Sequence, residues 1–159
     1  MIYLRNATRK HRLNLRALEK TATNLLAAVG ESGSTLSLSF IGDAAMRRLN
    51  RESRGKDRTT DVLSFPLLDR PAAKTKARSR ANFAPERMLG DIVISVDSAV
   101  RQAADYDARL EAELARLMIH GLLHLLGHDH EEARERVKME REERRLAQQI
   151  GLHWPYARG

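Results

Sequence analysis

The sequence predicts an α+β fold in which a small four-stranded mixed sheet packs against about five helices around a single core. Three observations lead to this prediction. Residues 35–41 alternate apolar and polar side chains, which is the period of a half-buried strand. Residues 12–29 instead repeat apolar side chains every three or four positions, as one face of a helix does. The uninterrupted apolar run 92–94 predicts a central strand that is covered on both faces.

The N-terminal half is expected to supply three of the strands and two of the helices. Gly30 can adopt the left-handed backbone conformation that ends a helix, and is expected to end the first one. Asp43 is expected to cap a short second helix, and Pro66 to end the third strand. Residues 54–61 are expected to form a loop before that strand. The expected strands are 2–5, 35–41 and 62–65, and the expected helices are 12–29 and 43–50.

The C-terminal half is expected to supply the last strand and three helices. The strand covers 89–96, and Asp97 caps a helix that runs to Tyr106. A helix over 109–126 turns five apolar residues inward: Leu110, Leu114, Leu117, Met118 and Leu125. The final helix, 131–150, is mostly charged and has a thin apolar stripe: Ala133, Val137, Met139, Leu146 and Ile150.

Composition narrows the class of protein. A chain of 159 residues suits one domain, 1–159. It contains no cysteine, which excludes disulfides, thiolate metal ligands and a cysteine nucleophile, and fits a reducing, cytoplasmic setting. The first residues lack the apolar stretch of a secretory signal, and no run is apolar enough to span a membrane. The formal net charge of +7 and the pI near 10.2 favour a polyanionic partner, most often nucleic acid.

Much of this positive charge is concentrated in residues 69–87. This segment carries six basic and two acidic residues and no apolar period, so we predict a long exposed loop. Such a loop can follow an RNA backbone through counterion release, or it can be a solvated segment without a partner. The basic residues expected to contact RNA are Lys74, Lys76, Arg78 and Arg80.

Four of the six histidines lie within residues 120–130, HGLLHLLGHDH. His120 and His124 are four residues apart, so on a helix they project from the same face and can share one metal ion. Gly127 allows the chain to turn back, which would bring His130 to the pair. Three neutral imidazoles with one open position have the form of a catalytic zinc site. The alternative is that these histidines are ordinary polar residues of a helix and a surface turn.

The third ligand has a competitor. His128 lies on the same turn and could replace His130, although we favour His130 from the spacing. Asp129 is expected to hold a ligand imidazole through a hydrogen bond. The histidine spacing is that of the metzincin proteases, but Gly121 stands where those enzymes carry the glutamate that acts as general base. This difference counts strongly against peptidase chemistry.

The histidine motif, together with RGKD at 54–57, TDVLSFP at 60–66 and LGDIVIS at 89–95, resembles the bacterial YbeY family, in order and over about residues 36–130. The resemblance implies a metal-dependent endoribonuclease that cleaves single-stranded RNA in ribosomal RNA maturation, with the small ribosomal subunit and its assembly factors as partners. It implies His120, His124 and His130 as ligands of one Zn²⁺ per chain and Arg54 as a functional arginine of the RNA cleft.

Two features depart from the family pattern. His128 stands where the family more often has an aromatic or aliphatic residue, and the basic segment 70–87 is longer and more positive than the family leads us to expect. Two other functions remain open at this point: a metzincin-like metallopeptidase, and a non-catalytic ribosome-assembly factor in which zinc only holds the C-terminal helices together. A fourth protein ligand would favour the latter, and an open coordination position would favour an enzyme.

Overall fold

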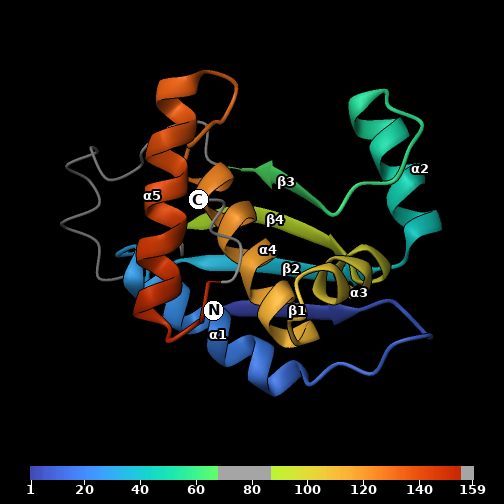
Figure 1. Cartoon of the computed structure of the whole chain (residues 1–159), viewed down its shortest axis with the longest axis horizontal. Helices are drawn as coiled ribbons and strands as arrows, with labels where there is room; N and C mark the ends of the chain where they lie inside the picture. The colour runs from blue at the N-terminus through green and yellow to red at the C-terminus, as the bar shows by residue number, and fades with distance from the viewer. Residues whose placement is uncertain (68–86, 155–159) are drawn as a thin grey trace.

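The computed structural model describes residues 1–67 and 87–154. Over these residues the chain forms one α+β domain with a four-stranded mixed sheet and five helices, as predicted (Figure 1). The elements, in chain order, are β1 (Ile2–Asn6), α1 (Leu15–Ala28), β2 (Thr35–Ile41), α2 (Asp43–Arg54), β3 (Val62–Pro66), β4 (Met88–Ser95), α3 (Val96–Asp105), α4 (Leu110–Leu125) and α5 (Ala133–Gln149). The predicted loop 69–87 lies outside the described residues except for Arg87.

The sheet has the strand order β1-β2-β4-β3. β1 and β4 both run parallel to β2, and β3 pairs antiparallel with β4 at one edge, in a register that places Leu63 opposite Val93. Parallel neighbours need a crossover, and α1 supplies it between β1 and β2. β4 is therefore a central strand, as its apolar run predicted.

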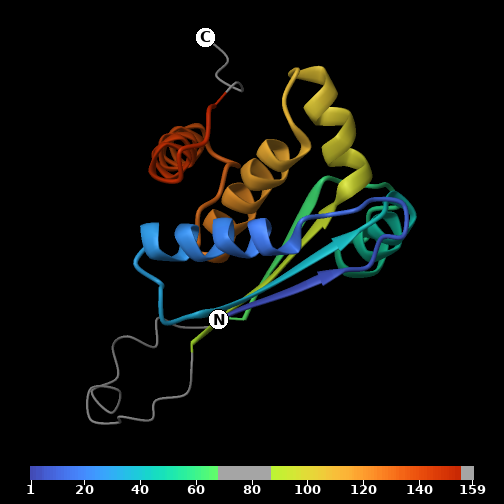
Figure 2. The ribbon, with the colours of Figure 1, turned by 90° about the horizontal axis from the view of Figure 1, so that it is seen from below.

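The two faces of the sheet are covered unequally. One face carries the main core, in which Ile92 and Ile94 pack with residues of α1 and α4, the helices that Figure 2 shows on the same side of the sheet. Val93 points to the opposite face, where Leu63 and Met46 of α2 form a smaller apolar cluster. The prediction that the apolar run is covered on both faces is thus confirmed.

Three details of the helices differ from the sequence-based expectation. Gly42, not Asp43, is the N-cap of α2, and Asp43 is its first helical residue. α2 also extends one turn beyond the expected end, so Arg54 is its last residue and not part of a loop; Gly55, with φ at 69°, ends the helix. The cap of α3 is Ser95, whose hydroxyl accepts the Ser98 N–H, while Asp97 lies in the first turn.

The two C-terminal helices differ in how well periodicity predicted their burial. In α4 the expected inward residues from Leu114 to Leu125 are buried, and Leu110 is half-buried. In α5, however, Val137 is 54% exposed, and the buried residues of this helix begin only at Met139. The buried residues of α5 are Met139, Glu143, Leu146 and Ala147. A carboxylic acid therefore occupies a position of the buried stripe.

Within the part of the chain that the structure describes, no helix combines the length and the apolarity that crossing a membrane requires.

Candidate metal centre and cleft

His120 and His124 lie one turn apart on α4, the most buried helix of the domain. Their neighbours Ile119, Leu122 and Leu123 are buried in the core, which fixes the position of the helix. The two histidines are half-buried and lie on the side of α4 that faces away from the core. The Nε2 atoms of the two rings are 3.2 Å apart. The i and i+4 spacing thus places the two side chains together, as predicted.

The turn after α4 brings His130 to this pair. Gly127 adopts φ of 96°, a left-handed conformation that favours glycine, and lets the chain fold back after the helix. The His130 ring centroid lies 5.7 Å from that of His120 and 5.1 Å from that of His124. One ring nitrogen from each of the three histidines lies within 4.8 Å of the others, which is close enough for a single metal ion.

Hydrogen bonds at the far side of two rings determine which nitrogen carries the proton. His124 Nδ1 is 2.9 Å from the backbone carbonyl of His128, and a carbonyl can only accept, so Nδ1 donates. His120 Nδ1 donates in the same way to Glu143 Oε2 at 3.2 Å. In the neutral rings each Nε2 therefore presents a lone pair, and the two lone pairs face each other. Such an arrangement is repulsive on its own and is typical of imidazoles oriented toward a shared cation.

The electrostatic environment of His124 favours the same state. Burial lowers the pKa of His124 below its usual value, and the neighbouring imidazoles of His120 and His130 lower it further. The neutral ring, which is the form that binds metal, is thus retained to lower pH than in a free histidine. The chemistry of the donor set and the direction of the lone pairs both fit a divalent transition metal.

The other two residues of the turn have different roles from those considered in the sequence. His128 takes no part in the cluster of three ring nitrogens, and its contribution is the backbone carbonyl that orients His124. Asp129 does not hold an imidazole, contrary to the expectation. Its carboxylate accepts the backbone N–H groups of His130 and Glu131, at 2.6 and 3.3 Å, and so shapes the turn. The acceptors that hold the imidazoles are the His128 carbonyl and Glu143.

Arg54 reaches the same cleft from the end of α2. Its Nη2 donates to the Ser64 carbonyl at 2.9 Å, and the guanidinium carbon lies 5.8 Å from the centre of the Phe65 ring. These two contacts with β3 fix the direction of an otherwise exposed side chain. The cleft has a volume of about 710 Å³, and its lining includes Arg54 and Lys56 together with His120, His124 and His130. The structure thus brings together all four residues predicted for the catalytic site.

Gly121 explains why the helix carries no acid beside its first histidine. The residue is buried where α4 crosses the sheet, and a Cβ atom added there would lie 2.8 Å from Ile92 Cγ2. It would also lie 3.2 Å from the Ser64 hydroxyl, which donates to the Gly121 carbonyl. The position faces the core and not the cleft, so a general base in the manner of the metzincins has no place here.

Of the predicted basic segment 69–87, the structure describes only Arg87. Lys74, Lys76, Arg78 and Arg80 lie outside the described residues. Arg87, which ends the basic segment, is fixed to the body of the domain by an ion pair with Glu31 at 2.7 Å.

Glu143 is a site residue that sequence reasoning missed. The sequence feature that could have revealed it is the i, i+4, i+7 spacing of Met139, Glu143 and Leu146, which places an acid on the apolar face of the helix.

The fold and this arrangement of histidines define an α+β protein in which three imidazoles, placed closely enough to hold one metal ion, line an open cleft. Comparison with known proteins then gives the family. The model of the family described as "Endoribonuclease YbeY" matches residues 3–151, so the chain belongs to the YbeY family.

Individual relatives agree with this assignment. The chain is 47% identical over 137 residues to an "Endoribonuclease YbeY" of Myxococcus xanthus, and 44% identical over 137 residues to one of Anaeromyxobacter sp.. These matches cover 86% of this chain but only 44% and 65% of the respective relatives, which are longer. A relative from Alkaliphilus metalliredigens is 41% identical, with 85% of this chain and 83% of the relative covered.

A solved structure shows the same fold. The solution structure of TM1509 from Thermotoga maritima superposes with a TM-score of 0.63 at 24% sequence identity, over 94% of this chain and 89% of that chain.

Proposed function

We propose that this protein is a zinc-dependent endoribonuclease that cleaves single-stranded ribosomal RNA in the cytoplasm, during maturation of the small ribosomal subunit. Membership of a family of endoribonucleases supports the nuclease class. The observation that carries the metal dependence is the 3.2 Å approach of the His120 and His124 Nε2 atoms on α4, with a ring nitrogen of His130 within 4.8 Å. Three imidazoles suit zinc better than the oxygen-seeking cations magnesium and calcium.

The residues of the cleft have separable roles in this function. His120, His124 and His130 hold one zinc ion per chain, and no other histidine, aspartate or glutamate of the described residues joins their cluster. When bound, zinc supplies a Lewis acid that polarises a phosphoryl oxygen and lowers the pKa of water. Three protein ligands leave one coordination position for substrate or water, which favours an enzyme over a protein whose zinc is purely structural.

Arg54 supplies the charge that phosphodiester cleavage requires. Attack on the phosphorus builds negative charge on the phosphoryl oxygens, and a guanidinium can bind two of them at once. The contacts of Arg54 with β3 hold it at the wall of the cleft that contains the histidines. The bond to Ser64 uses one of the five N–H donors of the group. Arg54 is thus a binding group for the reacting phosphate that is already oriented in the free protein.

Peptidase chemistry is the weaker alternative. A metzincin needs a carboxylate beside its first zinc-binding histidine, whereas Gly121 is buried and an added Cβ there would lie 2.8 Å from Ile92 Cγ2 in the core and not in the cleft. The proposed function therefore rests on phosphate chemistry.

The deciding experiment combines metal analysis with a cleavage assay on the purified protein. Inductively coupled plasma mass spectrometry should find about one zinc per chain. A single-stranded ribosomal RNA fragment should be cut internally, and a duplex of the same sequence should be left intact. Cleavage should stop after chelation and return when zinc is added. His124→Ala, purified in parallel, is the control for a contaminating nuclease.

Two results would contradict the proposal. One is cleavage that persists unchanged in the His124→Ala protein, which would assign the activity to another source or another site. The other is a zinc-loaded protein that never cuts RNA and whose metal is bound by a fourth protein ligand, seen by X-ray absorption spectroscopy. That result would favour the non-catalytic assembly factor.

A further inference from the structure

Glu143 is an acid buried in an apolar stripe. It lies on α5 between Met139 and Leu146, and its side chain is only 10% exposed. Burying a carboxylate is costly unless the group is paired and hydrogen-bonded. An acid at this position therefore calls for a specific partner.

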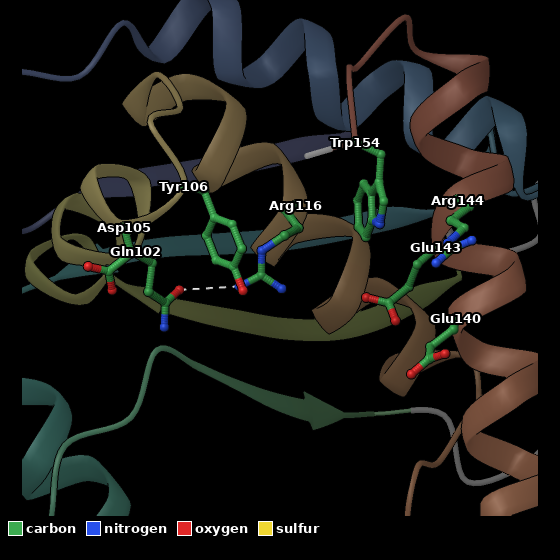
Figure 3. A pocket seen from close by; sticks show the side chains of 8 residues that line it. All are labelled: Gln102, Asp105, Tyr106, Arg116, Glu140, Glu143, Arg144 and Trp154. Atoms are coloured by element: carbon green, nitrogen blue, oxygen red, sulfur yellow. Dashed lines mark hydrogen bonds between the residues drawn. The ribbon is translucent and has the colours of Figure 1, made fainter. Parts of the chain in front are cut away.

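That partner is the metal-binding helix. Glu143 Oε2 lies 3.2 Å from His120 Nδ1, on the side of the ring opposite the other histidines. Figure 3 shows the Glu143 side chain extending from α5 toward Trp154, into a pocket that Arg116 of α4 also lines. Arg116 itself is held by a second buried acid, Glu113, at 2.7 Å. The two buried acids, Glu143 and Glu113, thus pair with His120 and Arg116, which lie four residues apart on α4.

The contact fixes His120 in two respects. Accepting the Nδ1 proton keeps the ring in the tautomer whose Nε2 is unprotonated, and the bond direction prevents the ring from turning this nitrogen away from His124. The His128 carbonyl fixes the tautomer and the orientation of His124 in the same way, by accepting its Nδ1 proton. A carboxylate behind a ligand imidazole also increases the electron density at the metal-binding nitrogen.

We propose that Glu143 is a positioning residue of the metal centre, and that through it α5 belongs to the site although it supplies no ligand. The inference rests on the proposed function only in taking His120 as a metal ligand. It has a mechanical consequence: both the turn with His130 and the side chain of Glu143 connect α5 to the site. Metal binding should therefore stabilise the docking of α5 against α4.

The first test needs no substitution and no activity. In the metal-free protein at a pH of about 8, where imidazoles are mostly neutral, long-range ¹H–¹⁵N correlation spectra identify the protonated ring nitrogen of each histidine. His120 should carry its proton on Nδ1. A proton on Nε2 would overturn the proposal, whether or not the protein cuts RNA.

The second test compares three variants. Glu143→Leu keeps the side-chain volume but removes the acceptor, and should weaken zinc binding by about 10- to 100-fold in competition with a chromophoric chelator. Glu143→Gln retains an oxygen acceptor without charge and should fall between Glu143→Leu and wild type. Glu140→Gln is the matched control, because Glu140 is exposed about one turn earlier on α5 and lines, together with Glu143, the pocket that Figure 3 shows. It should bind zinc like wild type.

Hydrogen exchange completes the comparison. Adding zinc should increase the protection of amides 139–147 in wild type and in Glu140→Gln, and should do so much less in Glu143→Leu. A folded Glu143→Leu protein with wild-type zinc affinity and wild-type protection would refute the positioning role. If Glu143→Leu does not fold, the tautomer of His120 in the wild-type protein and the affinity of Glu143→Gln decide the question.

Discussion

The Ser64 hydroxyl donates a hydrogen bond of 2.9 Å to the backbone carbonyl of Gly121, in the buried seam where α4 crosses β3. The carbonyl of the same serine accepts the Nη2 of Arg54. One residue of an edge strand thus contacts both the helix that carries the histidines and the arginine on the opposite wall of the cleft. The distance between these two parts of the site depends on how closely α4 approaches the sheet.

The packing at Gly121 gives the first prediction. Gly121→Ala should lower the free energy of unfolding by about 1–3 kcal/mol, because the new methyl group meets Ile92 Cγ2 at 2.8 Å and Ile92 is fully buried. Urea unfolding measures the change. Gly33→Ala is the control, since nothing lies within 4 Å of an added Cβ there and its loss should be small. Equal effects of the two substitutions would show that α4 can move away from the sheet.

Metal ligation gives the second prediction. His124→Ala should reduce the zinc content from about one per chain to near zero, whereas His128→Ala should leave it unchanged. The reason is that His128 acts through its backbone carbonyl, which alanine also has. Metal analysis of the dialysed proteins measures both. If His128→Ala loses zinc while His130→Ala keeps it, the third ligand has been assigned wrongly.

Arg54 gives the third prediction. Arg54→Glu should abolish cleavage of single-stranded RNA, while the zinc content and the melting temperature stay close to wild type, because the side chain is exposed and such changes usually cost under about 0.5 kcal/mol. Arg48→Glu changes charge equally on the same helix but lies outside the cleft, and should retain activity. Full activity of Arg54→Glu would remove Arg54 from the reaction. A large loss of stability would make it a structural arginine.

Acid stability gives the fourth prediction, through Asp43. Hydrogen bonds from Arg101 above all, and from Ser95 and Ser98, lower the pKa of Asp43 from 3.8 to about 2, against the opposing effect of burial. Because the folded pKa lies below the unfolded one, the stabilisation is fully present above about pH 4 and is lost as the pH falls toward 2. Asp43 and Arg101 are partly solvated, so the effect should be on the order of 1 kcal/mol or less.

The variant Asp43→Asn isolates this contribution. Unfolding free energies measured from pH 6 to pH 2 should show a gap between wild type and Asp43→Asn that is constant above pH 4 and closes toward pH 2. A gap that stays the same over this range would mean that the carboxylate charge is not what joins α2 to α3.

The basic segment gives the fifth prediction. Replacing Lys74, Lys76, Arg78 and Arg80 with alanine should weaken RNA binding for all sequences alike. It should also flatten the plot of log affinity against log salt by up to about 0.7 per lost phosphate contact on single strands. Cleavage at saturating RNA should persist because the histidines are untouched. An unchanged salt slope would show that this segment does not meet RNA.

The sequence alone predicted the sheet, the helices and the histidine cluster, because each depends on local periodicity or on a short spacing along one chain segment. The i and i+4 relation of His120 and His124 needs only a helix, and the return of His130 needs only a turn at Gly127. Arg54 entered through resemblance to a family and not through spacing. The structure then brought it to the same cleft.

What the sequence did not predict depends on contacts between distant segments. Glu143 meets His120 across two helices and 23 residues, a pairing that periodicity within α5 cannot reveal. The exposure of Val137 is likewise invisible to periodicity, since the buried residues of α5 begin only at Met139. The N-caps were misplaced by one residue at Gly42 and by two at Ser95, and α2 ends four residues later than expected, before Gly55.

The three histidines differ in how rigidly the fold holds them. His120 and His124 belong to α4, whose ten buried residues unfold only with the domain itself, whereas His130 is exposed on a turn that follows Gly127. We expect that a metal ion held by these histidines, as proposed, enters and leaves by displacement of this short turn while the rest of the fold stays intact. We therefore expect the rate of metal exchange to respond more to substitutions in residues 127–132 than to substitutions within α4.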